Sequence, residues 1–152
     1  MGMFEIDAEL EAVITAFEAQ GIDYAICGGV AVAVHGHPRA TTDIDIVVAP
    51  ETVDVARASL RALGYGLDAA PMLFSSGIEV RRVSRVESGE IFTLDLVLAT
   101  PVLADVWSGR QVVIWRDRPL RVVSRDGLIR MKRLAGRAQD KADLEALGAT
   151  DD

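Results

Sequence analysis

Three aspartates lie in segments that otherwise resemble buried strands, where aspartate is disfavoured. Asp43 and Asp45 stand two residues apart in the largely apolar segment 42–48. Side chains at this spacing point to the same face of a strand, so both carboxylates project together. Asp95 stands alone in the equally apolar segment 91–98. If the two strands are neighbours, the three carboxylates converge.

A cluster of three carboxylates predicts a site for divalent cations. Like charges this close repel one another and raise one pKa unless a cation compensates. Ligand sets made only of oxygen suit Mg²⁺ or Mn²⁺ rather than zinc. Two such ions could clamp the attacking and leaving oxygens of a phosphoryl or nucleotidyl transfer. The structural alternative is that Asp43 caps a strand end and Asp95 forms a buried pair.

A pair of glycines, Gly28-Gly29, follows the strand-like segment 22–27. Glycine allows a backbone to approach a ligand closely. The next residues, 30–34, alternate Val and Ala, a pattern that favours a second strand and a hairpin. If 30–35 is instead a helix, the amides at its start would suit a phosphate. The pattern is neither Gly-x-Gly-x-x-Gly nor a P-loop, which argues against dinucleotide and Walker-type sites.

The combination of these motifs is more specific than each alone. Gly28-Gly29, then thirteen residues, then Asp43-Ile44-Asp45 and a later lone aspartate resembles the DNA polymerase beta nucleotidyltransferase superfamily. The stretch 28–45 is similar to a small bacterial branch with type IV abortive-infection toxins and lincosamide and aminoglycoside nucleotidyltransferases. The resemblance implies that 30–35 is a helix and that Gly28 and Gly29 hold a triphosphate. It also implies that Asp43 and Asp45 bind both metals, and that Asp95 is a third metal ligand that acts as general base or orients the attacking hydroxyl.

The C-terminal segment 128–144 is also similar to the end of this branch. By that match Lys132 contacts the triphosphate, and Asp140 and Asp143 orient it or neighbouring side chains. Gln139 departs from the usual Lys-Asp pair, which weakens the role of Asp140. The alternative for Lys132 is an exposed helical lysine.

Two further residues near the first motif are candidates for nucleotide binding. Arg39 could neutralise phosphate charge or form a surface salt bridge. Thr42 could donate a hydrogen bond to a phosphate or to the carboxylates. Basic clusters at 81–85 and 130–137 are either solvated faces or local contacts for RNA.

Composition and element order predict one α+β domain over residues 1–152, with a mixed sheet covered by helices and two helices at the C-terminus. The chain has 152 residues, net charge -7 and a single cysteine, so no intrachain disulfide forms. This charge argues against nonspecific adhesion to nucleic acid.

No apolar run is long enough to cross a membrane, and the acidic start does not resemble a signal peptide, so a cytoplasmic protein is expected. Helices are expected at 4–20, 51–63, 101–107, 125–135 and 138–147, and strands at 22–27, 42–48, 72–74, 78–83, 91–98, 111–115 and 120–123, the last two joined at 117–119.

These observations predict an enzyme that transfers a nucleoside monophosphate from ATP or another NTP to a hydroxyl. The acceptor could be RNA, a protein or a small molecule, with Mg²⁺ or Mn²⁺ as cofactor. A toxin–antitoxin system, with an antitoxin protein as partner, rests on the resemblance alone. One alternative is a catalytically silent nucleotide-binding or partner-binding module of the same fold. Another is a structural domain with incidental aspartates.

Overall fold

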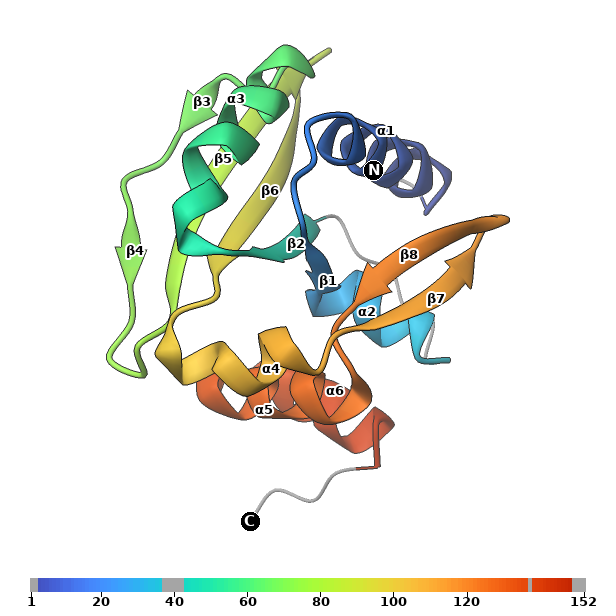
Figure 1. Cartoon of the computed structure of the whole chain (residues 1–152), viewed down its shortest axis with the longest axis vertical. Helices are drawn as coiled ribbons and strands as arrows, with labels where there is room; N and C mark the ends of the chain where they lie inside the picture. Colours follow the sequence, from blue (N-terminus) through green and yellow to red (C-terminus); the bar gives the residue numbers. More distant parts are fainter. Residues whose placement is uncertain (1–2, 37–42, 137, 149–152) are drawn as a thin grey trace.

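The computed structural model describes residues 3–36, 43–136 and 138–148, and their side chains except those of 3–5 and 138–141. The described chain is an α+β fold around one mixed sheet (Figure 1). Its elements are α1 (Met3–Ala19), β1 (Ala25–Cys27), α2 (Gly28–Val34), β2 (Asp43–Val48), the 3-10 turn η1 (Pro50–Thr52), α3 (Val53–Ala62), β3 (Leu67–Asp68), β4 (Met72–Leu73), β5 (Glu79–Glu87), β6 (Glu90–Leu98), the 3-10 turn η2 (Pro101–Leu103), α4 (Ala104–Ser108), β7 (Gln111–Trp115), β8 (Arg118–Val122), α5 (Arg125–Ala135) and α6 (Ala138–Ala146).

The sheet has the strand order β3-β5-β6-β2-β1-β8-β7, and β4 pairs with the outer side of β5. The pairs β2–β6 and β1–β8 are parallel, and the other pairs are antiparallel. The central strands β6, β2 and β1 are therefore distant in sequence but adjacent in space. This arrangement confirms the mixed sheet that the order of elements predicted.

One face of the central strands builds the hydrophobic core. Ile44 and Ile46 of β2 and Leu94 and Leu96 of β6 are fully buried. They alternate with the aspartates, so the aspartates lie on the opposite face. Helix α1 contacts both α3 and β2, and its buried apolar residues belong to the same core cluster: Leu10, Val13, Ile14 and Phe17. The alternation of strands thus gives one face to the core and leaves the other for the site.

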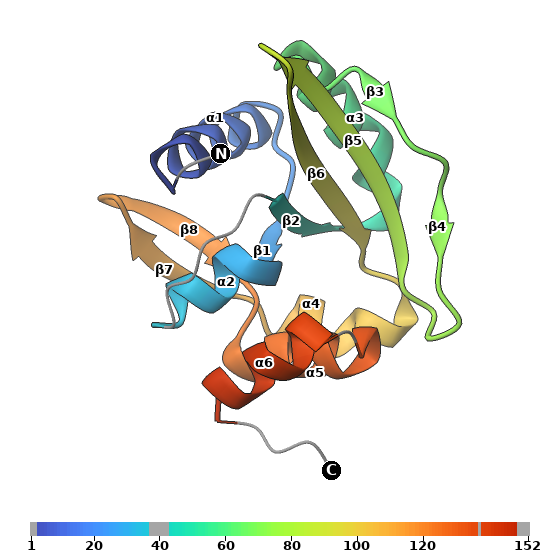
Figure 2. The same ribbon diagram turned by 180° about the vertical axis from the view of Figure 1, so that it is seen from behind.

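The helices α4, α5 and α6 gather at one end of the molecule, the lower end in both views (Figures 1 and 2). Helix α5 begins at the predicted cap: the Ser124 hydroxyl accepts a hydrogen bond from the Gly127 amide at 3.0 Å. It ends at Gly136, whose φ of 66° closes the helix in the left-handed conformation. These two signals fix the length of the helix that lines a pocket together with Asp45 and Asp95.

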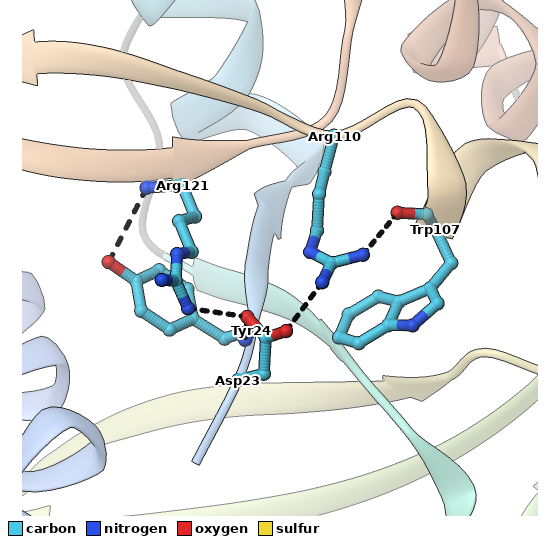
Figure 3. A network of polar contacts seen from close by, with 5 residues as sticks. All are labelled: Asp23, Tyr24, Trp107, Arg110 and Arg121. Atoms are coloured by element: carbon cyan, nitrogen blue, oxygen red, sulfur yellow. Dashed lines mark hydrogen bonds and ion pairs between the residues drawn. The ribbon is translucent and has the colours of Figure 1, made fainter. Parts of the chain in front are cut away.

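The β7–β8 hairpin is tied to the start of β1 by a polar network around Asp23 (Figure 3). The Asp23 carboxylate accepts hydrogen bonds from Arg110 and from Arg121, the latter at 2.6 Å. The Arg110 guanidinium lies 4.0 Å from the centroid of the Trp107 ring. Burial opposes ionisation of Asp23, but the hydrogen bond and charge of Arg110, with Arg121, outweigh it and lower its pKa. Because every member is partnered, the network is a structural anchor before the start of β1, whereas Gly28 follows its end.

The structure settles the ambiguous segment and corrects two boundaries. Residues 30–34 belong to helix α2, as the family resemblance implied, and not to the strand that their alternation favours. The hairpin turns at Arg116 and Asp117, both with positive φ, rather than at 117–119. Strand β3 was not predicted, and β5 extends to Glu87 rather than ending at 83. Among the described helices, none combines the length and the hydropathy needed to cross a bilayer.

Candidate active site

Four side chains form a row across the sheet on the face away from α1. Cys27 on β1 pairs in register with Asp45 on β2, Asp45 pairs with Asp95 on β6, and Asp95 pairs with Arg82 on β5. Register partners on neighbouring strands stand about 4.8 Å apart and point to the same side of the sheet. The structure therefore brings Asp45 and Asp95, which are 50 positions apart in the sequence, into direct proximity.

The row of Asp45 and Asp95 marks a boundary between polar and apolar parts of this face. On one side, Asp43 is exposed and pairs with Thr93. On the other side, Val97 pairs with Val80, and both are buried. Asp43 lies one pleat beyond Asp45 on the same face, so the three predicted aspartates share one region of the sheet.

Gly28 provides the space that the Asp45 side chain occupies. A Cβ at position 28 would lie 2.1 Å from Asp45 Oδ2 and 2.8 Å from its Cγ. Gly28 also has a φ of 66°, which other residues adopt only with strain. Glycine is therefore favoured at position 28 for two independent reasons, and the first of them shows that the Asp45 carboxylate lies against the start of α2.

Arg82 holds the third aspartate through both of its carboxylate oxygens. Its Nε lies 2.8 Å from Asp95 Oδ1 and its Nη2 lies 3.0 Å from Asp95 Oδ2. This hydrogen bond is the main cause that raises the pKa of Arg82, and the charges of Asp95, Asp43 and Asp45 add to it against partial burial. Arg82 thus supplies the positive charge that the row of carboxylates requires. The sequence placed it only in a basic cluster, and no local pattern pointed to Asp95.

In this arrangement the three predicted aspartates do not stand together as one metal-binding cluster. Within residues 6–36, 43–136 and 142–148, whose side chains are described, no group of three or more His, Cys, Asp or Glu side chains is close enough to hold a metal ion. The Asp95 carboxylate faces Arg82 instead. The structural alternative expected Asp95 to form a buried pair. Asp95 does form a pair, with Arg82, but Arg82 is 43% exposed and the pair is open to solvent.

Lys132 is buried and not an exposed helical lysine. Its Nζ lies 3.0 Å from Asp143 Oδ2, and the two side chains are only 6% and 3% exposed. The pair joins α5 to α6. The resemblance assigned Asp143 to the triphosphate or to neighbouring side chains, and the structure places it on the neighbouring lysine.

A pocket of about 310 Å³ connects the row of Asp45 and Asp95 with Lys132. Its volume is at the lower end of the range for small-molecule sites. Burial, followed by the charge of Asp45, raises the pKa of the Cys27 thiol well above its usual range, so this thiol stays protonated. The pocket is lined by Cys27, Gly28, Asp45, Met72, Phe74, Ser75, Ser76, Ile78, Val80, Arg82, Asp95, Val97, Leu128, Met131, Lys132, Leu134 and Ala135.

Several predicted residues do not line this pocket. Gly29 is buried behind Gly28 in α2, and Asp43 lies outside the lining. Arg39 and Thr42 fall in residues 37–42, and the side chain of Asp140 in 138–141, outside the described part of the chain. A wider hollow of about 600 Å³ is lined by residues of α5, among them Arg125, Arg130 and Arg133, and by Gly148, and it contains none of the predicted catalytic residues.

Comparison with known proteins gives similarity in structure alone. No protein-family model and no curated sequence matches the chain. A candidate nucleotidyltransferase from Thermotoga maritima superposes with a TM-score of 0.71 at 15% identity, over 95% of this chain and 93% of that chain. The antibiotic-resistance factor ANT(2'')-Ia superposes with a TM-score of 0.67 at 14% identity, over 97% and 84% of the two chains. A second structure of ANT(2'')-Ia, in complex with adenylyl-2''-tobramycin, gives a TM-score of 0.62 at 14% identity, over 92% and 86%. The chain therefore has the fold of the nucleotidyltransferases.

Proposed function

We propose that this protein transfers a nucleoside monophosphate from an NTP to a hydroxyl acceptor and depends on a divalent metal. One observation carries the proposal: Asp45 and Asp95 are register partners beside Gly28, in a pocket that also contains Lys132. A purely structural domain has no need for two adjacent carboxylates that repel each other on an accessible face. The fold, shared with nucleotidyltransferases, supports the same conclusion.

The side chains at this site fit a hard divalent cation. Asp43, Asp45 and Asp95 offer only carboxylate oxygens, the ligands that Mg²⁺ and Mn²⁺ prefer. The bidentate contact of Arg82 with Asp95 supports this fit, because one of the three carboxylates already binds a cationic group of the chain. When bound, the metal would stabilise negative charge on the attacking and leaving oxygens.

The residues of this chain have separable roles in the proposed transfer. The acceptor oxygen attacks the α-phosphorus, the bond from that phosphorus to the bridging oxygen of the β-phosphate breaks, and pyrophosphate leaves. Asp95 takes the proton of the acceptor hydroxyl on a lone pair that its two hydrogen bonds from Arg82 leave available. Lys132 binds the phosphates across the pocket from Asp95. Gly28 keeps Asp45 in position.

The acceptor is a hydroxyl of RNA, a protein or a small molecule, and ATP is one candidate donor. The complex of ANT(2'')-Ia contains adenylyl-2''-tobramycin, so a protein of this fold binds a molecule in which adenylyl is joined to an aminoglycoside. An antitoxin partner gains no support from the comparisons, and we do not propose one.

The proposal is tested with each of the four NTPs labelled at the α-phosphate, with Mg²⁺ or Mn²⁺, in the presence of total RNA, protein extract or small alcohols. We expect label in an acceptor and equimolar pyrophosphate from the wild type, and neither from Asp45→Asn. In chelator, Asp45→Asn should melt at or above the wild-type temperature, because one repelling charge is removed. It should lose the rise in melting temperature that metal gives the wild type. Asp126→Asn, at a 95% exposed carboxylate, is the control and should behave as wild type.

A nucleotide- or partner-binding module without catalysis is the second candidate. The observation in its favour is the ion pair between Arg82 and Asp95, because Asp95 already has a partner within the chain. Metal-dependent NTP binding without pyrophosphate release, under all the acceptor conditions above, would select this alternative. A wild type that ignores metal, with an Asp45→Asn variant that melts well below it in chelator, would make Asp45 a structural residue and defeat both.

A further inference from the structure

The pocket has a second half that the proposed catalytic residues do not use. Away from Asp45, Asp95 and Arg82, its lining carries no charged residue among those described other than Lys132. It consists mainly of apolar residues from the β4–β5 segment and from α5, with Val97 of β6, together with Ser75 and Ser76. The strand register explains this change, because Met72 pairs with Val80 and Val80 pairs with Val97, one pleat beyond Arg82 and Asp95.

We propose that this apolar half binds the base of the NTP, with the ring of Phe74 as the stacking surface. The inference rests on the proposed function, and it assigns a donor subsite to residues that neither the motifs nor the comparisons point to. We define the base subsite as Met72, Phe74, Ser75, Ser76, Ile78, Leu128 and Met131.

The arrangement of α5 connects the apolar half to the phosphates rather than to the acceptor. Leu128, Met131 and Lys132 follow the spacing i, i+3, i+4, which places them on one face of the helix. All three line the pocket. A ligand whose phosphates reach Lys132 therefore passes beside Leu128 and Met131, and the rest of it can extend toward the β4–β5 side of the same pocket. A nucleotide, with charge at one end and a flat ring at the other, matches this division, whereas a polycationic acceptor would require acidic groups here.

Phe74 stands on a backbone that is fixed in advance. The Phe74 amide donates to the Ile78 carbonyl at 2.9 Å, and the Gly77 amide donates to the Phe74 carbonyl at 2.9 Å. The Thr100 hydroxyl donates to the Gly77 carbonyl at 3.0 Å, which ties the turn to η2. Arg130 of α5 donates to the carbonyl of Val102 in the same η2 at 3.1 Å. The turn and the helix, which both line the pocket, are thus held by one short segment.

The side chain of Phe74 is 50% exposed although it borders a pocket. A large apolar ring in this state is a surface on which a flat base can stack without rearrangement of the core. The Ser75 and Ser76 hydroxyls can both donate and accept hydrogen bonds, so they do not select one base. We therefore expect purine NTPs, with the larger ring, to bind more tightly than pyrimidine NTPs.

The experiment compares calorimetric binding of ATP and inorganic tripolyphosphate, both with Mg²⁺, to the full chain. Phe74→Ala should weaken ATP binding roughly fivefold to a hundredfold, the loss expected for one base–aromatic stack. It should leave tripolyphosphate binding unchanged. Leu73→Ala is the matched control, because Leu73 is 75% exposed next to Phe74 in the chain but lies outside the pocket lining. Phe74→Tyr keeps the ring and should keep ATP affinity.

The outcomes separate this inference from the proposed function. If Phe74→Ala melts as the wild type does but binds ATP equally well, while Asp45→Asn loses Mg²⁺-dependent binding, the base subsite is wrong and the enzyme proposal stands. The base subsite is equally wrong if Phe74→Ala raises only the KM of an acceptor, since the apolar half would then hold the acceptor. If the wild type binds none of the four NTPs with metal, both proposals fall.

Discussion

The Asp45 carboxylate occupies the space where any side chain at position 28 would begin. Asp45 Oδ2 would lie 2.1 Å from a Cβ on Gly28. This contact makes the second aspartate of the motif depend on the first glycine, although 16 residues separate them in the sequence.

Gly28→Ala is expected to displace Asp45 as well as strain the backbone. Gly21 has nearly the same φ, 67° against 66°, but a Cβ at position 21 would have no atom within 4 Å. Gly21→Ala should therefore lower the free energy of unfolding only through backbone strain, by about 1–2 kcal/mol. Gly28→Ala should lower the free energy of unfolding further and abolish Mg²⁺-dependent stabilisation. Melting curves of both variants with metal and with chelator test this, and equal losses in the two would show that the contact with Asp45 is unimportant.

Arg82→Gln is expected to make the protein more dependent on metal. Without the guanidinium, the carboxylates of Asp95 and Asp45 repel each other with less compensation. The free energy of unfolding in chelator should fall by about 1 kcal/mol, since the pair is open to solvent, which is about 3 °C in melting temperature for a chain of this size. Added Mg²⁺ should recover this loss and give a larger rise than in the wild type.

Arg81→Gln is the control for Arg82, because Arg81 pairs with Leu96 and points to the other face of β5. It should leave the response to metal unchanged. An Arg82→Gln variant that melts as wild type does in chelator and gains no more from metal would show that Arg82 does not serve as counter-charge.

Lys132→Ala is expected to destabilise the protein strongly, because it leaves Asp143 buried without this cation. Breaking a buried pair by removing one partner costs about 3–5 kcal/mol, or about 10 °C here. The double variant Lys132→Met with Asp143→Leu replaces the pair by apolar groups and should recover most of that stability. If Lys132 also binds phosphate, the double variant should still bind ATP about tenfold or more weakly. Wild-type affinity in a stable double variant would limit Lys132 to joining α5 and α6.

Asp23 is expected to contribute to stability at neutral pH and to lose that contribution in acid. Its pKa is lowered in the folded state, where Arg110 and Arg121 outweigh burial. The unfolded chain therefore binds the proton more tightly, and the contribution is present above the ordinary pKa, about pH 4, and lost as pH falls through the lowered value. Asp23→Asn should melt below wild type at pH 7, by no more than about 1 kcal/mol. The difference should shrink as the pH falls below the ordinary pKa and through the lowered one; a difference that stays constant across this range would rule out the ionic origin.

The sequence predicted most elements and the three aspartates because their signals are local. Apolar alternation around Asp43 and Asp45 identified β2, and Ser124 and Gly136 bounded α5. The local pattern was misleading at 30–34. Helix α2 is short and its residues Val30, Ala31 and Val32 are all buried, so it lacks the polar face that marks an amphipathic helix.

What the sequence did not reveal depends on pairing between distant segments. The partner of Asp95 is Arg82, fixed by the antiparallel register of β5 and β6. The partner of Lys132 is Asp143, fixed by the packing of α6 on α5. The apolar half of the pocket combines Phe74 with Met131, which share no motif. The spacing of residues along the chain does not reveal any of these contacts.

The strand register also protects the site against errors in folding. If β6 shifted by one residue against β2, Leu94 or Leu96 would stand next to Asp45 and Asp95 would enter the core. Such a shift would bury a charge and expose leucines at the same time, so it is disfavoured by the whole core rather than by the aspartates. The chain does not need the carboxylates to find one another. Hydrophobic residues on the opposite face of the sheet align them, and mutations that loosen this alternation should reduce the proposed activity before they unfold the protein.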